Sequence, residues 1–228
     1  MAPLYPLGRD YQSNVIINSL LLPNGLLPEL TNLSSGLPPN PKPNWADYTV
    51  PMVRFPDGSF VMDSAQIAPK LEALQPEAPS LLLNRSLEEE VQKALNEGFM
   101  PVFPSLCRRL CERVVAGEDG EWFEKDRAAR FGMSLAELEA QKGGDSAWEA
   151  ARPGLQKLCA VLKKYKKDEG PFCLGSQPSY ADMIVVAMLH MFKDKRIGDD
   201  VYERFVKTGG EELGELYEAA RPWLMKVD

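Results

Sequence analysis

The C-terminal two thirds of the chain, from residue 84 on, is a succession of helical segments with their own start and stop signals. Ser86 is followed three residues later by Glu89, which is the spacing of a capping box at the start of a helix. Pro101 and Pro104 fall in the same segment and predict a kink. Such a run of segments predicts a bundle, and we expect an all-helical domain over residues 84–228.

The most apolar of these segments runs from Pro178 to Phe192. Ser179 and Asp182 have capping-box spacing directly ahead of the apolar run 183–189. We expect this helix to be buried on nearly all sides, where no water can satisfy its first N–H groups. The box therefore predicts a structural cap, and we assign it no chemistry.

Composition indicates a soluble globular protein. Of the 228 residues 44% are hydrophobic, and no apolar run approaches the roughly 20 residues of a membrane span. The net charge of -7 disfavours nucleic acid and anionic membrane as partners. Four cysteines are too few for a disulfide scaffold, and the first residues do not look like a secretory signal, so we expect a reducing, cytoplasmic location.

Residues 1–47 are unlike the rest because prolines punctuate them. Only Tyr11 to Leu22 stays free of proline for long enough to hold an element, and the stretch from Gly36 to Trp45 is predicted to be an extended loop. Regular structure is therefore expected to be limited in this segment.

A hairpin and a helix are predicted next. Two β-branched runs, at 48–55 and 59–62, flank a Pro-Asp-Gly turn at 56–58. A helix then opens at Asp63 or Ser64. The proline-marked connector after this helix is the expected domain boundary.

Pro51 stands inside the first strand, where it cannot donate a ladder hydrogen bond. If the Val50–Pro51 bond is cis, Val50 can present its backbone to an extended, peptide-like ligand; the alternative is an ordinary edge-strand proline. Asp63 and Ser64, at a helix start, suit an ammonium and a carboxylate, or form a plain N-cap. Glutathione offers a peptide backbone, a carboxylate and an ammonium.

Other polar motifs favour structural roles. Cys107 and Cys111 lie four residues apart, but the chain has one histidine, His190, and no second cysteine pair nearby, so a zinc site lacks ligands. We expect both cysteines to be buried or partly buried. His190 ends an apolar run and is predicted to be a hydrogen-bonded structural histidine.

Val50-Pro51, the hairpin, Asp63-Ser64 and a helical domain with "PSYAD" resemble the cytosolic glutathione S-transferases. Four longer motifs resemble the fungal branch of that family and extend the resemblance over residues 36–228: "YTVPMVRFPDGSFVMDSAQIA", "WFEKDRAARFGMSLAELEAQKGG", "GPFCLGSQPSYAD" and "GGEELGELYEAARPWL". The implied fold class is α+β. A thioredoxin-like domain over 1–75, shortened or atypical in 1–47, is followed by a linker at 76–83 and the all-α domain at 84–228.

The resemblance also implies roles for individual residues. Val50 would pair with the cysteinyl backbone of glutathione, Pro51 would be cis, and Asp63 and Ser64 would hold the γ-glutamyl end. Glutathione would be the co-substrate, with no metal. A second substrate would lie against the first long helix, whose candidate lining residues are Phe99, Met100 and Phe103; we expect at least one of these to face the core instead.

The catalytic group is the point of departure from the family, which places a serine, tyrosine or cysteine at the first N-terminal turn. The segment after residue 7 does not match that pattern. Ser13 and Tyr11 are the nearest hydroxyls, and Ser13 is our candidate for activating the thiol, against a plain loop or N-cap serine.

Three functions remain open on these residues. The first is a glutathione S-transferase-like enzyme, a homodimer by family resemblance, that conjugates glutathione to an electrophilic small molecule, or uses it to open or isomerise one, in fungal secondary metabolism. The alternative is a non-catalytic glutathione-binding or scaffold protein that has lost the thiol-activating turn. A cysteine-dependent reductase is disfavoured because no cysteine falls in the N-terminal turn.

Overall fold

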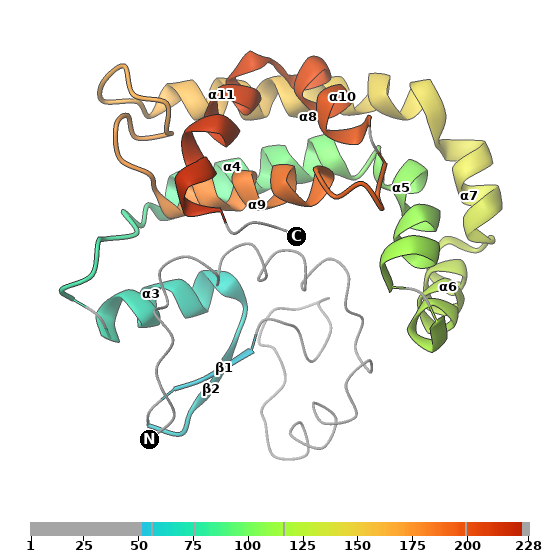
Figure 1. Cartoon of the computed structure of the whole chain (residues 1–228), viewed down its shortest axis with the longest axis horizontal. Coiled ribbons are helices and arrows are strands. Elements are labelled where there is room, and N and C mark those ends of the chain that lie inside the picture. The colour runs from blue at the N-terminus through green and yellow to red at the C-terminus, as the bar shows by residue number, and fades with distance from the viewer. Residues whose placement is uncertain (1–51, 56, 75, 116, 199, 225–228) are drawn as a thin grey trace. The chain divides into compact units, whose positions relative to one another are not determined.

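The computed structural model describes residues 52–55, 57–74, 76–115, 117–198 and 200–224. The predictions for Ser13, Val50, Pro51 and the rest of 1–51 lie outside these residues. The described chain forms two compact units, one ending at Leu81 and the other beginning at Leu82 (Figure 1).

The first unit opens with the predicted hairpin. Strands β1 (Met52–Arg54) and β2 (Phe60–Met62) pair antiparallel. The Phe55 N–H donates to the Ser59 carbonyl at 2.8 Å, and the Gly58 N–H donates to the Phe55 carbonyl at 2.9 Å. Gly58 has φ +84°, which glycine adopts without a steric penalty. The hairpin is confirmed, and the second strand is one residue shorter than predicted.

Helix α3 (Ser64–Leu74) begins where the sequence predicted. Ile67 is fully buried and anchors the helix in the core of this unit. Near its end, the Glu72 carboxylate accepts hydrogen bonds from the Ser80 hydroxyl and, at 3.0 Å, from the Leu81 N–H. The connector after α3 is therefore fastened back onto the helix it leaves.

The second unit contains the predicted helical bundle. No helix of the described chain is both long and apolar enough to cross a membrane. The helices are α4 (Arg85–Phe99), α5 (Phe103–Arg109), the π-helix η1 (Leu110–Val115), α6 (Gly117–Phe131), α7 (Leu135–Lys142), α8 (Gly144–Lys164), α9 (Tyr180–Phe192), α10 (Val201–Gly209), α11 (Glu211–Ala220) and the 3₁₀ turn η2 (Arg221–Trp223).

The predicted capping box of Ser86 and Glu89 is wrong. The N-cap of α4 is Asn84, whose Oδ1 accepts from the Leu87 N–H at 3.2 Å. The Asn84 N–H donates to Glu88 Oε1 at 2.8 Å. Asparagine caps as well as serine, and the helix therefore begins two residues earlier, with Ser86 inside its first turn.

The predicted kink at the two prolines is confirmed as a complete break. Helix α4 ends at Phe99, and α5 starts at Phe103 with Pro104 in its first turn. A proline ring excludes the carbonyl four residues earlier but fits the first turn of a helix. The interruption and the restart therefore follow from Pro101 and Pro104.

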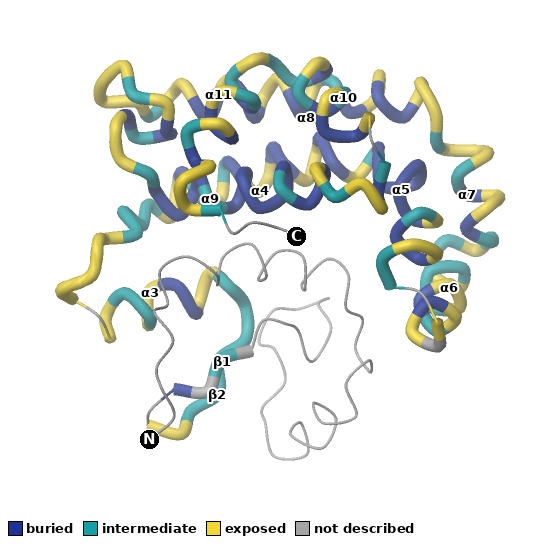
Figure 2. The backbone as a smooth tube through the Cα atoms, viewed as in Figure 1, coloured by how far each residue is buried: buried dark blue, intermediate teal, exposed yellow. Residues whose placement is uncertain are grey.

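Helices α4 and α8 meet backbone to backbone at Gly98 and Gly154. A Cβ placed on Gly154 would lie 2.4 Å from the Gly98 nitrogen, and one on Gly98 would lie 2.3 Å from a Leu155 methyl carbon. Only glycine permits this approach. The long buried stretches of α4, α8 and α9 in Figure 2 form the core built around this crossing.

Helix α9 carries the predicted structural cap. Asp182 is 0% exposed, and its Oδ2 accepts from the N–H and hydroxyl of Ser179 at 2.7 and 2.6 Å. Its Oδ1 accepts from the Cys173 N–H at 2.7 Å. The capping box is confirmed, and the same carboxylate fixes the loop that precedes the helix.

Candidate functional site

Asp63 and Ser64 are the predicted site residues that the described chain contains. They lie at the junction where β2 ends and α3 begins, and both are partly exposed. The candidate pair thus lies between a strand on one side and a helix on the other.

Asp63 has a left-handed backbone, with φ +73°. Aspartate tolerates this region better than most residues, but it remains uncommon outside glycine. The turn allows the chain to pass from an extended strand into a helix within one residue. Backbone held in this region requires surroundings that enforce it, and such positions cluster at ligand sites.

Asp63 is also the N-cap of α3. Its Oδ1 accepts from the Ala65 N–H at 3.2 Å, and its carbonyl accepts from the N–H groups of Gln66 and Ile67 at 2.9 and 3.0 Å. The structural role that the sequence offered as an alternative is therefore present. Capping uses Oδ1, and it orients the carboxylate at the helix start.

Ser64 is the first residue of α3, where the helix dipole presents partial positive charge. A hydroxyl and backbone N–H groups at such a position suit a carboxylate, whereas the neighbouring Asp63 carboxylate suits an ammonium. Together, the two residues match both ends of an amino acid: Asp63 suits its ammonium, and Ser64 at the helix start suits its carboxylate.

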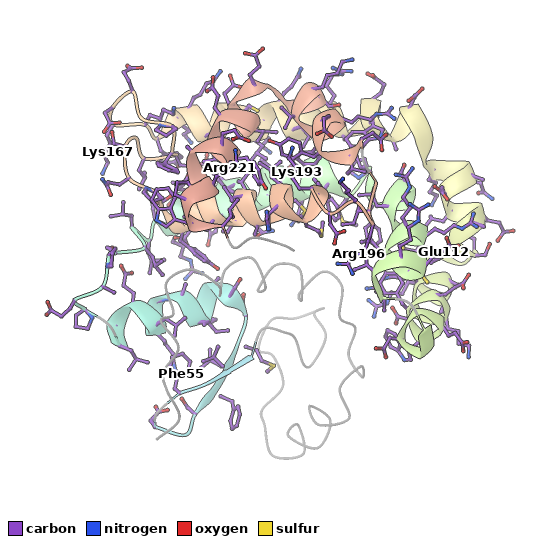
Figure 3. All side chains as sticks on the ribbon, in the orientation of Figure 1. Phe55, Glu112, Lys167, Lys193, Arg196 and Arg221 are labelled. Carbon is purple, nitrogen blue, oxygen red and sulfur yellow. The ribbon has the colours of Figure 1, made fainter. Side chains whose placement is uncertain are left out.

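The hairpin beside this junction is itself held to α3. Phe55, labelled in Figure 3, is 7% exposed, and the Lys70 ammonium lies 5.2 Å from the centre of its ring. A cation over an aromatic face is attracted by the partial negative charge on that face of the ring. The contact joins the hairpin to the helix that presents Asp63 and Ser64.

The candidate residues for a second substrate do not all face outward. Phe99 and Phe103 are 2% and 8% exposed, and their rings pack edge to face at 5.8 Å. The expectation that at least one of them faces the core is confirmed for both. Met100, which lies between them, is 53% exposed.

All four cysteines are free and buried, as expected for Cys107 and Cys111. Burial raises the pKa of Cys107 and of Cys159 to about 12, and it also raises the pKa of Cys111 and of Cys173. Thiols in this state are poor nucleophiles at neutral pH. Within the described residues, no cluster of histidine, cysteine and acidic side chains could hold a metal ion.

The predicted structural role of His190 is confirmed. Its Nδ1 lies 2.9 Å from the Tyr217 hydroxyl, in hydrogen-bond contact. The feature that sequence reasoning missed is the left-handed backbone of Asp63. The available signal was an aspartate directly between a strand and a helix, and many ordinary N-caps share it.

Comparison with known proteins identifies the family. The model of the glutathione S-transferase C-terminal domain matches residues 86–223. Glutathione S-transferase-like protein ustS of Aspergillus flavus is 26% identical over an alignment 212 residues long, which covers 87% of this chain and 75% of ustS.

Two solved structures share the fold. A glutathione S-transferase of Ceriporiopsis subvermispora, in complex with glutathione, aligns with a TM-score of 0.69 and 23% identity over 92% of this chain and 90% of its own. Glutathione transferase GSTFuA2 of Phanerochaete chrysosporium aligns with a TM-score of 0.73 and 18% identity over 94% and 90%. The expected α+β class, a thioredoxin-like domain before an all-helical domain, is confirmed. With more than half of its length matched by the family's own helical domain, the chain belongs to the glutathione S-transferase family, in its fungal branch.

Proposed function

We propose that the protein binds glutathione and transfers its thiolate to an electrophilic small molecule. The observation that carries this proposal is the junction of Asp63 and Ser64, where a left-handed turn and a helix start bring a carboxylate next to a hydroxyl. A structural neighbour from Ceriporiopsis subvermispora was solved with glutathione, which adds support from outside this chain.

In this proposal Asp63 binds the ammonium of the γ-glutamyl group, and Ser64 binds its carboxylate. Val50 pairs with the cysteinyl backbone next to a cis Pro51, and Ser13 donates a hydrogen bond to the sulfur. The thiol gives its proton to solvent water, and the thiolate forms a carbon–sulfur bond with the electrophile. In a conjugation a leaving group departs with its electron pair, and in a ring opening the opened substrate takes up a proton from water. In an isomerisation the carbon–sulfur bond breaks again after the rearrangement and releases glutathione.

The setting we propose is the cytoplasm of a fungus, in secondary metabolism, with the protein as a homodimer. Four free buried thiols suit a reducing compartment. The net charge of -7 argues against nucleic acid and anionic membrane surfaces as partners.

The first experiment is calorimetric titration of the full chain with glutathione, beside the variants Asp63→Asn and Ser64→Ala. Asparagine keeps the cap and tolerates the left-handed backbone, so Asp63→Asn removes only the charge. Losing a charge-assisted hydrogen bond costs about 2 kcal/mol, which is roughly 30-fold in affinity. Asp57→Ala, in the hairpin turn, is the matched control and should bind normally.

The second experiment is a conjugation assay with a general aryl halide on the same samples. Binding with turnover supports the transferase, and Ser13→Ala then tests the activating hydroxyl. Binding without turnover favours the scaffold alternative. If glutathione does not bind, or binds Asp63→Asn as tightly as the wild type, the proposed roles of Asp63 and Ser64 are wrong.

A further inference from the structure

A cluster of rings and charges joins the end of α9 to α10 and α11. The His190 and Tyr217 rings stack with centres 6.1 Å apart at an interplanar angle of 24°, and the Tyr202 ring lies 5.2 Å from that of Tyr217. The Lys193 ammonium sits 3.5 Å from the centre of the Tyr202 ring and 5.9 Å from that of Tyr217. Three helices therefore meet around one histidine.

The hydrogen bond between His190 and Tyr217 is the polar part of this contact. Tyr217 is 6% exposed, and burial raises the pKa of its hydroxyl, which therefore keeps its proton. The Nδ1 of a neutral His190 can accept a hydrogen bond from that hydroxyl or donate one to it, depending on the tautomer of the ring. A protonated ring can only donate, so the hydroxyl hydrogen must turn away.

The charges around His190 leave little compensation for a second cation. Lys193 on α9 already brings an ammonium to the cluster and lies 3.5 Å from Glu203 of α10. Glu218 of α11 pairs with Arg221 of η2 at 3.1 Å. Lys193 and Arg221 are both labelled in Figure 3, on the side where α9 meets α11. Both of these carboxylates are therefore already paired.

The other helix packed on α9 supplies no counter-ion either. Helix α4 meets it through the Phe99 and Phe192 rings, 6.0 Å apart. The acidic residues Glu90 and Glu97 of α4 are paired with lysines of α8. The dipole at the C-terminus of α9 does favour a cation at His190. Burial acts in the opposite direction and lowers the pKa of His190 below its ordinary value.

We propose that His190 is a proton-sensitive latch that holds helix α11 and the turn η2 against α9, and that its protonation loosens this C-terminal segment. The segment is also held by the buried apolar side chains Leu213, Leu216 and Ala220, and at its end by Trp223, which packs edge to face on Phe172 at 5.8 Å and is 37% exposed. The loosening is therefore a shift in a local opening equilibrium, with α11 still packed on the bundle for most of the time. The latch is closed at neutral pH and opens as the pH falls.

The direction of the pH effect follows from the linkage between proton binding and opening. A histidine with a lowered pKa in the folded state binds fewer protons there than in the open state. Its contribution to the closed state is fully present above about pH 6.5, the ordinary histidine pKa. It declines below that pH and levels off below the folded pKa. Each unit of pKa displacement corresponds to a tenfold change in the opening equilibrium.

The test uses the full chain without a histidine tag, in which His190 is the single histidine. Its ring C–H resonance, followed by NMR from pH 8.5 to 4.5, should titrate below 6.5. Hydrogen exchange of residues 211–223, corrected for intrinsic rates, should lose several-fold more protection between pH 7.5 and 5 than residues 85–99. The variant His190→Asn, which can still hydrogen-bond but cannot titrate, should lose this pH response.

Tyr217→Phe is the matched control, because it removes the hydroxyl and leaves the titrating ring. It should raise exchange of residues 211–223 at both pH values and keep the pH response. A titration midpoint at or above 6.5 would overturn the latch, as would an equal pH response in wild type and His190→Asn. If His190→Asn does not fold, His190→Gln takes its place, and the NMR midpoint decides independently.

Discussion

The described parts of the two units differ in the elements and the buried groups that they contain. The unit that ends at Leu81 consists, in its described part, of a short hairpin and one helix, and the buried apolar side chains of that part are Phe55, Ile67 and Ala68. The unit that begins at Leu82 has many helices, a backbone contact at Gly98 and Gly154, and a buried carboxylate with its hydrogen-bond donors in place.

The candidate binding residues and the structural polar groups lie in different units. The candidate ligand residues Asp63 and Ser64 lie in the unit that ends at Leu81, where an unfavourable backbone angle is held at a partly exposed position. Two polar groups of the second unit hold its elements together: the buried Asp182 fixes a loop, and the half-buried His190 joins helices. Substitutions should therefore damage folding in one unit and binding in the other.

The largest effect is expected from Asp182→Ala. This variant leaves the Cys173 N–H and the N–H and hydroxyl of Ser179 buried without their acceptor. Unsatisfied buried groups cost 1–3 kcal/mol each, so the loss should be about 4 kcal/mol or more. Urea unfolding followed by circular dichroism measures it.

The matched control for Asp182→Ala is Glu137→Ala. Ser134 and Glu137 form the same capping box at the exposed start of α7. Water can replace the lost carboxylate there, so this substitution should cost only a small fraction of the first. Equal losses in the two variants would show that burial does not set the value of a cap in this fold.

Gly154→Ala should produce the next largest effect. Its Cβ would lie 2.4 Å from backbone atoms of Glu97 and Gly98, so α4 and α8 must separate. Overpacking of this kind costs about 3 kcal/mol. Gly214→Ala in α11 is the control, because its Cβ would meet Val206 at an ordinary 3.4 Å, and alanine favours the helix. Calorimetric melting should separate the two, and similar melting temperatures would contradict the close approach.

A smaller, local effect is expected at Asp63. Asp63→Val places a β-branched residue at φ +73° and should destabilise the start of α3 by about 2 kcal/mol. Asp63→Gly keeps the backbone and loses only the carboxylate, so α3 should stay nearly as stable. Hydrogen exchange of residues 64–74 measures the difference, with residues 85–99 unchanged. Equal exchange in both variants would mean that the backbone angle is not a constraint.

The elements with strong local signals could be predicted from the sequence. The hairpin followed from the Asp-Gly turn, and the cap of α9 followed from Ser179 and Asp182 ahead of an apolar run. The start of α4 was misplaced because two capping signals overlap within three residues. Asn84 satisfies the first turn directly, so the spacing of Ser86 and Glu89 had no part in it.

Contacts distant in sequence could not be predicted in the same way. Nothing near Gly98 or Gly154 indicates that the two glycines meet, because the contact depends on how α4 crosses α8. The left-handed backbone angle at Asp63 could not be predicted either, because an aspartate before a helix gives the same sequence pattern with an ordinary or a left-handed backbone. The two members of the candidate pair were identified, and the backbone geometry that singles them out was not.

The smallest effect is expected from Cys111→Ser. The Cys111 thiol donates to the Gly120 carbonyl at 3.2 Å, and a serine hydroxyl can make the same bond. Burial raises the pKa of this thiol, so it is a poor nucleophile at neutral pH. Conjugation activity should stay within about twofold of wild type, at a similar melting temperature. Lost activity in a variant that melts normally would restore the hypothesis of a cysteine-dependent reductase. The reaction would then use a sulfur of the protein as well as the sulfur of glutathione.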